Sequence, residues 1–185
     1  MAAITTTQIS LGYKAPDFRL TDTLSDKELS LEELKSDKAT VIMFICNHCP
    51  YVKHVQEQLV KLANDYMGRG IVFIAINSND AVNYPEDAPD KMKETGERFN
   101  FPFPYLYDET QDVARAYHAA CTPDFDIFDG EMKCVYRGQL DDSRPGNGIP
   151  VTGFDIRAAL DALLEGRAVS KEQKPSIGCS IKWKE

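Results

Sequence analysis

The sequence predicts an α/β fold, in which a central mixed β-sheet carries helices on both faces. Two apolar segments, 41–45 and 71–76, flank an amphipathic segment that starts at Pro50. This pattern is typical of a parallel strand–helix–strand unit. Farther along the chain, short apolar runs on either side of Asp129-Gly130 have the composition of a β-hairpin. A parallel unit followed by a hairpin requires a sheet with both strand directions.

The first half of the chain is expected to alternate short and long elements. In order, these are an irregular lead over 1–16, a short strand over 17–20, a helical turn over 31–35, a buried strand over 41–45, and a long helix from Pro50 to Gly68. Ser30 and Glu33 have the spacing of a capping box, which starts the helical turn. One buried face of the long helix is predicted by apolar residues three and four apart: Val52, Val55, Leu59, Leu62 and Tyr66.

The second half of the chain is expected to continue with short strands and helices, up to a last helix before residue 168. We expect a strand over 71–76, a loop over 77–90, helices over 91–99 and 111–120, a strand over 102–107, a hairpin over 125–136, a loop over 144–153, and an amphipathic helix carrying Ile156, Leu160, Leu163 and Leu164. Residues 168–185 have no sustained periodicity. The predicted division is therefore one domain over 1–167, with an N-terminal extension, and a C-terminal tail over 168–185.

Composition limits the classes of partner. The chain has 185 residues and a net charge of −8, which argues against a nucleic-acid or anionic-membrane surface. It has neither the basic and apolar regions of a secretory signal nor an apolar run of membrane-spanning length. The expected location is the cytoplasm, where thiols stay mostly reduced and a Cys-x-x-Cys pair is more often catalytic or metal-binding than a static disulfide.

Cys46 and Cys49 stand where the first buried strand gives way to the long helix. The N-terminus of a helix stabilises a negative sulfur, so we expect the pKa of Cys46 to fall below the usual value of about 8.5. Cys46 would then attack a partner disulfide, and Cys49 would resolve the mixed disulfide. His48 lies between the two cysteines and would favour the thiolate or carry a proton.

Several motifs resemble those of the thioredoxin superfamily. The Cys-x-x-Cys position and a Thr122-Pro123 step before the hairpin both match that superfamily. More narrowly, APDFRLTD, FICNHCPYV, CTPDF, YRGQLDDSRPGN and PSIGCSIKWK resemble redoxin-domain proteins of the AhpC/TSA-like, peroxiredoxin-like group. The resemblance implies a thioredoxin-like fold in which Pro123 is a cis-proline facing the cysteines and Thr122 lies in the substrate groove.

The chain departs from these families at the site itself. Neither cysteine has the Pro and the Thr or Ser of the peroxiredoxin motif Pro-x-x-x-Thr/Ser-x-x-Cys at the required spacing. The buried acid and the Trp that thioredoxins place by their cysteines are missing from residues 40–45. His48 is therefore the expected proton carrier.

We predict a thiol-disulfide oxidoreductase with no cofactor and no metal. It would act on a protein or small-molecule disulfide and be reduced by a partner such as a thioredoxin reductase or a glutathione system, without nucleic acid or membrane. Two alternatives stay open: a thiol-dependent peroxidase with an antioxidant role, and a non-catalytic binding module that keeps the fold.

Each of the five cysteines has an alternative role. For Cys46 and Cys49, the alternatives to redox chemistry are half of a structural zinc site or two inert buried thiols. Cys121, two residues before Pro123, is either an additional redox thiol or a small buried apolar residue. Cys179 either reaches back to the active-site cysteines or has no role, and Cys134 is expected in the core.

Overall fold

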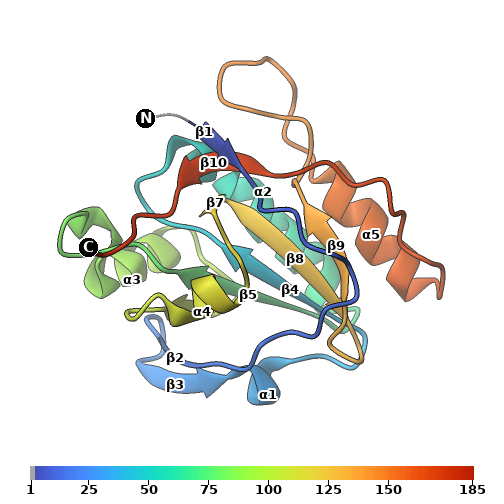
Figure 1. The fold of residues 1–185 in the computed structure, drawn as a ribbon, viewed down its shortest axis with the longest axis horizontal. Helices are drawn as coiled ribbons and strands as arrows, with labels where there is room; N and C mark the ends of the chain where they lie inside the picture. The colour runs from blue at the N-terminus through green and yellow to red at the C-terminus, as the bar shows by residue number, and fades with distance from the viewer. Residues whose placement is uncertain (1–2) are drawn as a thin grey trace.

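The computed structural model describes residues 3–185, and its largest feature is a seven-stranded sheet (Figure 1). Its strands are β2 (Arg19–Asp22), β3 (Lys27–Ser30), β4 (Ala39–Phe44), β5 (Ile71–Asn77), β6 (Tyr105–Tyr107), β8 (Asp124–Asp129) and β9 (Cys134–Gly138). They lie in the order β3-β2-β6-β5-β4-β8-β9. Strand β5 runs parallel to β4 and β6, whereas the other neighbours are antiparallel. The predicted mixed sheet is confirmed.

Five α-helices and one 3₁₀ turn connect the strands in the described part of the chain. They are α1 (Leu31–Leu34), α2 (Pro50–Met67), the 3₁₀ turn η1 (Pro85–Asp87), α3 (Pro89–Arg98), α4 (Asp112–Ala116) and α5 (Phe154–Leu164). The Ser30–Glu33 capping box is present at α1, as predicted. All five residues predicted to form the inner face of α2 are buried. None of these helices is long and apolar enough to cross a membrane.

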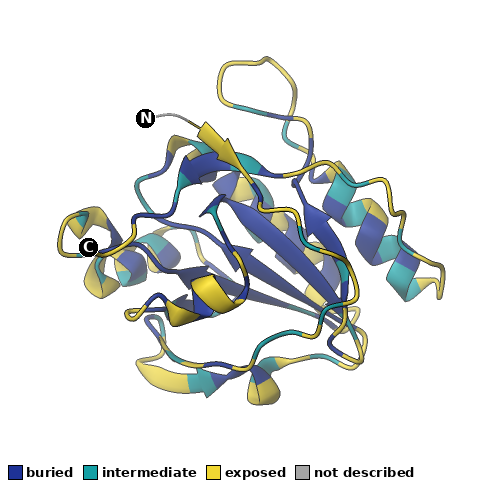
Figure 2. Cartoon of the chain, in the orientation of Figure 1, coloured by how far each residue is buried: buried dark blue, intermediate teal, exposed yellow. Residues whose placement is uncertain are grey.

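The sheet is covered on both faces, and β4 at its centre is buried along its whole length (Figure 2). Successive side chains of a strand point to opposite faces. Val41 and Met43 therefore join the core cluster formed with α2 and α5, whereas Ile42 and Phe44 join the cluster formed with α4. This two-sided burial explains why the sequence of β4 is continuously apolar.

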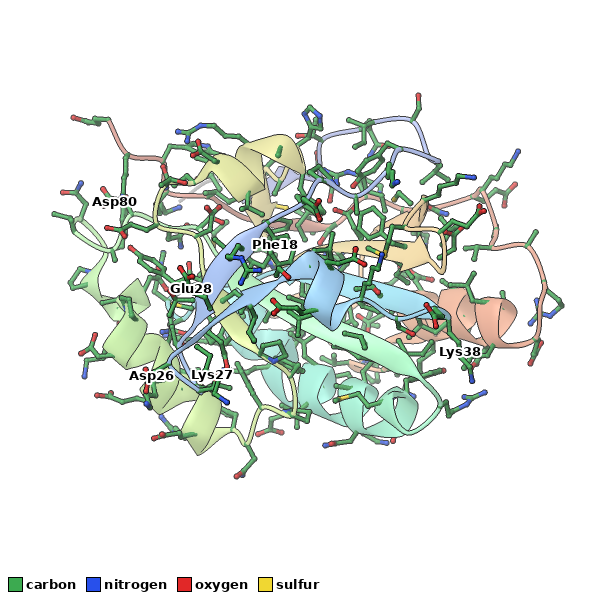
Figure 3. All side chains as sticks on the ribbon, turned by 90° about the horizontal axis from the view of Figure 1, so that it is seen from below. Phe18, Asp26, Lys27, Glu28, Lys38 and Asp80 are labelled. Atoms are coloured by element: carbon green, nitrogen blue, oxygen red, sulfur yellow. The ribbon has the colours of Figure 1, made fainter. Side chains whose placement is uncertain are left out.

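The β2–β3 hairpin forms one edge of the sheet, and β9 forms the opposite edge (Figure 3). Figure 3 shows Asp26, Lys27 and Glu28 at its turn, and Lys93 of α3 bonds Asp26 there at 2.7 Å. The strand predicted over 17–20 begins two residues later, at Arg19. Residues on both sides of the turn belong to strands, because β2 ends at Asp22 and β3 begins at Lys27.

A second, three-stranded sheet joins the two ends of the chain (Figure 1). Its strands are β1 (Ala3–Thr5), β10 (Ile177–Ser180) and β7 (Cys121–Thr122), and β10 lies between the other two. The prediction of a wholly irregular lead over 1–16 is wrong for residues 3–5; residues 1–2 lie outside the described part. Strands of two to four residues are too short to show a periodicity. The division into a domain and a tail stays a prediction, but residues 177–180 pack on the domain.

Candidate functional site

Strand β4 ends at Phe44, and α2 begins at Pro50, so both cysteines of the Cys-x-x-Cys motif precede the helix. Cys49 is the N-cap of α2, with Pro50 in the first turn. Cys46 lies in the short connection from β4. Their exposed fractions are only 2% for Cys46 and 0% for Cys49. The structure thus brings both predicted thiols to a buried strand–helix corner.

The Thr122–Pro123 peptide lies against both sulfurs and is cis, as predicted. The Thr122 hydroxyl is 3.3 Å from Cys46 Sγ, and the Thr122 carbonyl oxygen is 3.2 Å from Cys49 Sγ. Strand β8 follows at once and pairs with β4. The pairing holds this peptide next to the end of β4, where the cysteines begin.

Strand β10 adds a third cysteine to the corner. Cys179 pairs with Thr122 in the β10–β7 register, and its Sγ lies 2.7 Å from Cys49 Sγ. Gly178 makes this approach possible, because a Cβ at that position would lie 2.0 Å from the Thr122 carbonyl oxygen. Of the two additional cysteines predicted as candidates, the structure places Cys179 in direct contact with the dithiol.

Cys121 and Cys134 are buried without contacting another sulfur in the described chain. Cys121 is fully buried, and its thiol donates only to the Pro123 carbonyl oxygen, at 3.7 Å. Burial raises its pKa, which keeps the thiol protonated. Cys134 lies in β9 and donates to the Tyr136 carbonyl oxygen at 3.3 Å, which suits a core residue.

The negative sulfur of the cluster is Cys49. A hydrogen bond from the Cys46 thiol, then bonds from the Cys179 thiol and from the Val52 and Cys179 backbone N–H groups, lower the pKa of Cys49 to about 5 against the opposing effect of burial. The same bond to Cys49, burial and the Asp87 charge raise the pKa of Cys46. The predicted lowering of the Cys46 pKa is therefore wrong, because the bond to Cys49, burial and the Asp87 charge all raise it.

His48 forms a hydrogen bond with a buried acid, Asp87, which the sequence did not predict as part of the site. Asp87 is fully buried, and its Oδ2 accepts a hydrogen bond from His48 Nδ1 at 2.5 Å. The bond to Asp87 raises the pKa of His48, although burial opposes this effect. His48 Nε2 is also buried and has no hydrogen-bond partner within residues 3–185. Asp87 therefore orients the imidazole next to the cysteines and favours its protonated form.

Asp87 is held ionised by a dense set of donors. Burial opposes its charge, but hydrogen bonds from His48, Asn79 and the Asn47 backbone N–H lower its pKa. The Asn47 bond is 2.7 Å and the Asn79 bond 2.9 Å. The sequence analysis treated residues 77–90 as an ordinary loop. The available signal was that polar residues directly follow a buried strand, at the same edge of the sheet as the Cys-x-x-Cys motif.

Tyr84 covers one face of the His48 ring, and Lys182 of the C-terminal segment lies close to Tyr84. Tyr84 stacks on the imidazole, with ring centroids 5.4 Å apart, and the Lys182 ammonium lies 5.7 Å from the Tyr84 centroid. Lys182 is fixed by its backbone, because its N–H donates to Asn79 Oδ1 at 2.8 Å and its carbonyl oxygen accepts from the Asp80 N–H at 2.9 Å. The predicted tail therefore supplies part of the site.

Cys46, His48 and Asp87 place a thiol, an imidazole and a carboxylate within 4.8 Å of one another. A structural zinc site normally uses four ligands. Here the His48 Nδ1 and an Asp87 oxygen are already hydrogen-bonded to each other. This donor set fits a polarised imidazole next to a thiol better than a metal centre.

Comparisons with known proteins identify the family and the fold of the chain. Residues 11–138 match the profile of the AhpC/TSA family. A thiol-disulfide oxidoreductase ResA from Geobacillus kaustophilus is 28% identical over 136 residues, which are 72% of this chain and 73% of ResA. An uncharacterised conserved protein from the same species has a crystal structure with a TM-score of 0.98, at 68% identity over 100% of this chain and 97% of its own.

More distant structures share the fold. A hypothetical protein from Sinorhizobium meliloti has a TM-score of 0.95 at 48% identity, covering 97% of this chain and 98% of its own. The thioredoxin domain of a Bacteroides vulgatus thiol-disulfide oxidoreductase has a TM-score of 0.59 at 20% identity, covering 70% and 89% of the two chains. The predicted thioredoxin-like fold is confirmed. The family match covers more than half of the chain, which therefore belongs to the AhpC/TSA family.

Proposed function

We propose that the protein is a thiol-disulfide oxidoreductase whose redox centre is the Cys46–Cys49 dithiol. One observation carries the proposal: at the N-terminus of a helix, both sulfurs lie against the cis Thr122–Pro123 peptide, with Cys46 Sγ 3.3 Å from the Thr122 hydroxyl and Cys49 Sγ 3.2 Å from the Thr122 carbonyl oxygen. This arrangement holds one thiolate and one thiol within reach of each other, which thiol–disulfide exchange requires. The ResA relative, named as an enzyme of this class, supports the same function.

Cys46 is the sulfur that meets the substrate in this proposal. Cys49 Sγ is enclosed between the Thr122 carbonyl oxygen and Cys179, whereas Cys46 lies on the loop before the helix. As Cys46 attacks a substrate disulfide, its proton passes to the Cys49 thiolate, and the substrate releases its first sulfur as a thiolate. Cys49 then gives up that proton to the released thiolate and attacks Cys46 Sγ. The products are the Cys46–Cys49 disulfide, one substrate thiol and one substrate thiolate.

The His48–Asp87 pair and the cis peptide have positioning roles. The bond to Asp87 favours the protonated form of the imidazole, and a positive charge there lowers the cost of negative charge on the sulfurs as protons move between them. The Thr122 hydroxyl contacts Cys46 Sγ, and the Thr122 carbonyl oxygen contacts Cys49 Sγ. Thr122 and Pro123 together form the groove where a substrate disulfide lies. Protein or small-molecule disulfides are the proposed substrates, and a thioredoxin reductase or a glutathione system is the proposed source of electrons.

One preparation tests this function against its two rivals. Insulin-disulfide reduction and hydrogen peroxide consumption are measured side by side on wild type, Cys46→Ser and Cys49→Ser, with Cys134→Ala as the matched control. We expect insulin reduction in wild type and in Cys134→Ala, and its loss in both serine variants. Peroxide consumption lost with either cysteine, without insulin reduction, identifies a peroxidase. Neither activity in a folded protein identifies a binding module. Stoichiometric zinc in the purified protein would contradict the dithiol role.

A further inference from the structure

We propose that Cys179 is a third redox thiol. It attacks Cys49 in the Cys46–Cys49 disulfide, forms a Cys49–Cys179 disulfide and returns Cys46 to its reduced state. This proposal rests on the dithiol function proposed above. It adds a second disulfide, Cys49–Cys179, to the reaction cycle. The juxtaposition that carries it is a 2.7 Å separation between Cys49 Sγ and Cys179 Sγ, not far beyond the disulfide bond length of about 2.0 Å.

The contact is built into the fold. Cys179 is in the interior of β10, and its position is fixed by pairing with Ala3 on one side and Thr122 on the other. Gly178 allows the strand to approach the Thr122 carbonyl oxygen, as described above. A second link runs from the Ser176 hydroxyl to the Pro123 carbonyl oxygen at 2.6 Å. The strand is thus held at the cis peptide just before the cysteine, and Ser180 pairs with Cys121 just after it.

The exchange balances without any added reagent. The Cys179 thiolate attacks Cys49 Sγ of the Cys46–Cys49 disulfide, the Cys49–Cys179 bond forms, and the bond to Cys46 breaks. Cys46 leaves as a thiolate and takes up the proton that Cys179 gave up. One disulfide is present before and after the step, so no electrons are gained or lost.

The exchange moves the disulfide toward the surface. Cys179 is 7% exposed, compared with 2% for Cys46 and 0% for Cys49. A reducing partner therefore reaches the Cys49–Cys179 disulfide more readily than the one between Cys46 and Cys49. The substrate would be met on the Cys46 side and the reductant on the Cys179 side.

Peptide mapping distinguishes the two disulfides. Cys46 and Cys49 fall in one tryptic peptide, 39–53, whereas Cys179 falls in peptide 172–182, because trypsin does not cut Lys174-Pro175. A Cys46–Cys49 disulfide is therefore an internal loop, and a Cys49–Cys179 disulfide is a cross-link between two peptides. The reduced protein is oxidised with one equivalent of diamide, quenched with acid at successive times, digested and analysed by mass spectrometry without reduction.

We expect the internal loop first in wild type, followed by growth of the cross-link. In Cys46→Ser most of the protein should carry the cross-link, which Cys49→Ser and Cys179→Ala should abolish. Cys121→Ala and Cys134→Ala are matched controls and should leave the map unchanged. Reduction of the oxidised protein by dithiothreitol should be several-fold slower for Cys179→Ala than for wild type, and thermal melts of both verify folding.

Each failure has its own signature. If wild type reduces insulin through an internal loop, and no cross-link appears in wild type or in Cys46→Ser, the role of Cys179 is overturned and the proposed function stands. If the cross-link forms as expected but wild type does not reduce insulin, the proposed function is overturned while the sulfur exchange is retained. A cross-link from peptide 39–53 to the Cys121 peptide, 116–133, in place of the one to peptide 172–182, would assign the third thiol to Cys121 instead.

Discussion

Cys49 is the residue on which the chemistry of the site depends, because it alone contacts both of the other sulfurs. Two thiols and two backbone N–H groups point at its Sγ. Hydrogen bonds to the charged form of a group lower the pKa of an acid, and here they outweigh burial. One negative charge is thus shared by three buried cysteines: it rests on Cys49 in the reduced protein and is released to Cys46 when the Cys46 proton passes to Cys49.

The first prediction concerns this thiolate. Its absorbance at 240 nm in the reduced wild type should titrate with a pKa of about 5. Cys46→Ser replaces the thiol that donates to Cys49 by a hydroxyl in a different position, so the pKa should rise by about one unit, the cost of one weakened hydrogen bond. Cys134→Ala is the control and should titrate as wild type does. A wild-type midpoint above pH 8 would contradict the assignment of the charge to Cys49.

The second prediction concerns the His48–Asp87 pair. Asp87→Asn removes the carboxylate that raises the pKa of His48, so this pKa should fall, as measured by NMR titration of the imidazole. Breaking a buried pair typically costs about 3 kcal/mol, which urea denaturation would measure at pH 6. The pKa of folded His48 is raised, so the stabilisation is complete below pH about 6.5 and decreases as pH rises through the folded value.

The control for this pair is Asp65→Asn. Asp65 forms its ion pairs at the surface with Lys61 and Arg157, and exposed pairs contribute less than about 1 kcal/mol. A loss of stability in Asp87→Asn no larger than in Asp65→Asn, or one that does not change between pH 6 and pH 9, would show that the charge on His48 does not stabilise the fold.

At the scale of elements, β10 brings residues 177–180 against the site, where Cys179 contacts Cys49. Its position depends on how closely two backbones approach at Gly178, where no side chain larger than hydrogen fits. The strand is only four residues long, so its location is set by these contacts and by pairing on both edges. Moving β10 by a small distance should therefore change the site before it changes the rest of the fold.

The third prediction tests this point with Gly178→Ala. The added methyl group would overlap the Thr122 carbonyl oxygen, so β10 must move away at a cost of about 1–3 kcal/mol. The Cys49–Cys179 contact should weaken, and the pKa of Cys49 should rise with it. Chemical denaturation and the thiolate titration measure the two effects. Gly68→Ala is the matched control, since a Cβ there meets no atom within 4 Å. Equal behaviour of the two variants would contradict the packing argument.

The strength of local signals explains what the sequence predicted at this scale. Strands β4 and β5 and helix α2 are long and strongly apolar or periodic, so their type was predicted correctly and their limits nearly so. Cys46 and Cys49 were found because they are close in sequence. Asp87 was missed because it lies 39 residues from its partner His48. Such contacts depend on the tertiary fold, which no local pattern encodes.

At the scale of the whole molecule, a second buried charge cluster lies behind the site. Asp124 and Asp126 are each 1% exposed and share one guanidinium, that of Arg137, which bonds both oxygens of Asp126 at 2.8 Å. One Asp124 oxygen accepts from the Thr6 hydroxyl, and the other has no partner in the described chain. Burial raises the pKa of Asp124 to about 6 and that of Asp126 to about 7.

The fourth prediction concerns the dependence of stability on pH. Folded Asp124 keeps its proton to a higher pH than unfolded Asp124, so the folded state binds more protons between pH 4 and 6. The free energy of unfolding should therefore fall with rising pH in this window. Asp124→Asn removes this term, and the difference between variant and wild type should change by about 3 kcal/mol from pH 4 to pH 7.

Urea denaturation at several pH values measures this difference, with Asp142→Asn as the control. Asp142 is a half-exposed surface carboxylate whose pKa is lowered by hydrogen bonds from Lys174 and Gln139, so it is already ionised in this window. Stability curves of wild type and Asp124→Asn that stay parallel from pH 4 to pH 7 would rule out a raised pKa at Asp124.

Strand β10 also has a consequence for biosynthesis. Cys179 lies 130 residues after Cys49, and closing a chain segment of that length costs on the order of 4 kcal/mol of entropy. During translation, the emerging polypeptide presents Cys46 and Cys49 long before residues 177–182 leave the ribosome. The nascent chain therefore carries its two adjacent thiols without the wall that encloses Cys49. The dithiol acquires its buried environment only once β10 has emerged and paired with β1 and β7.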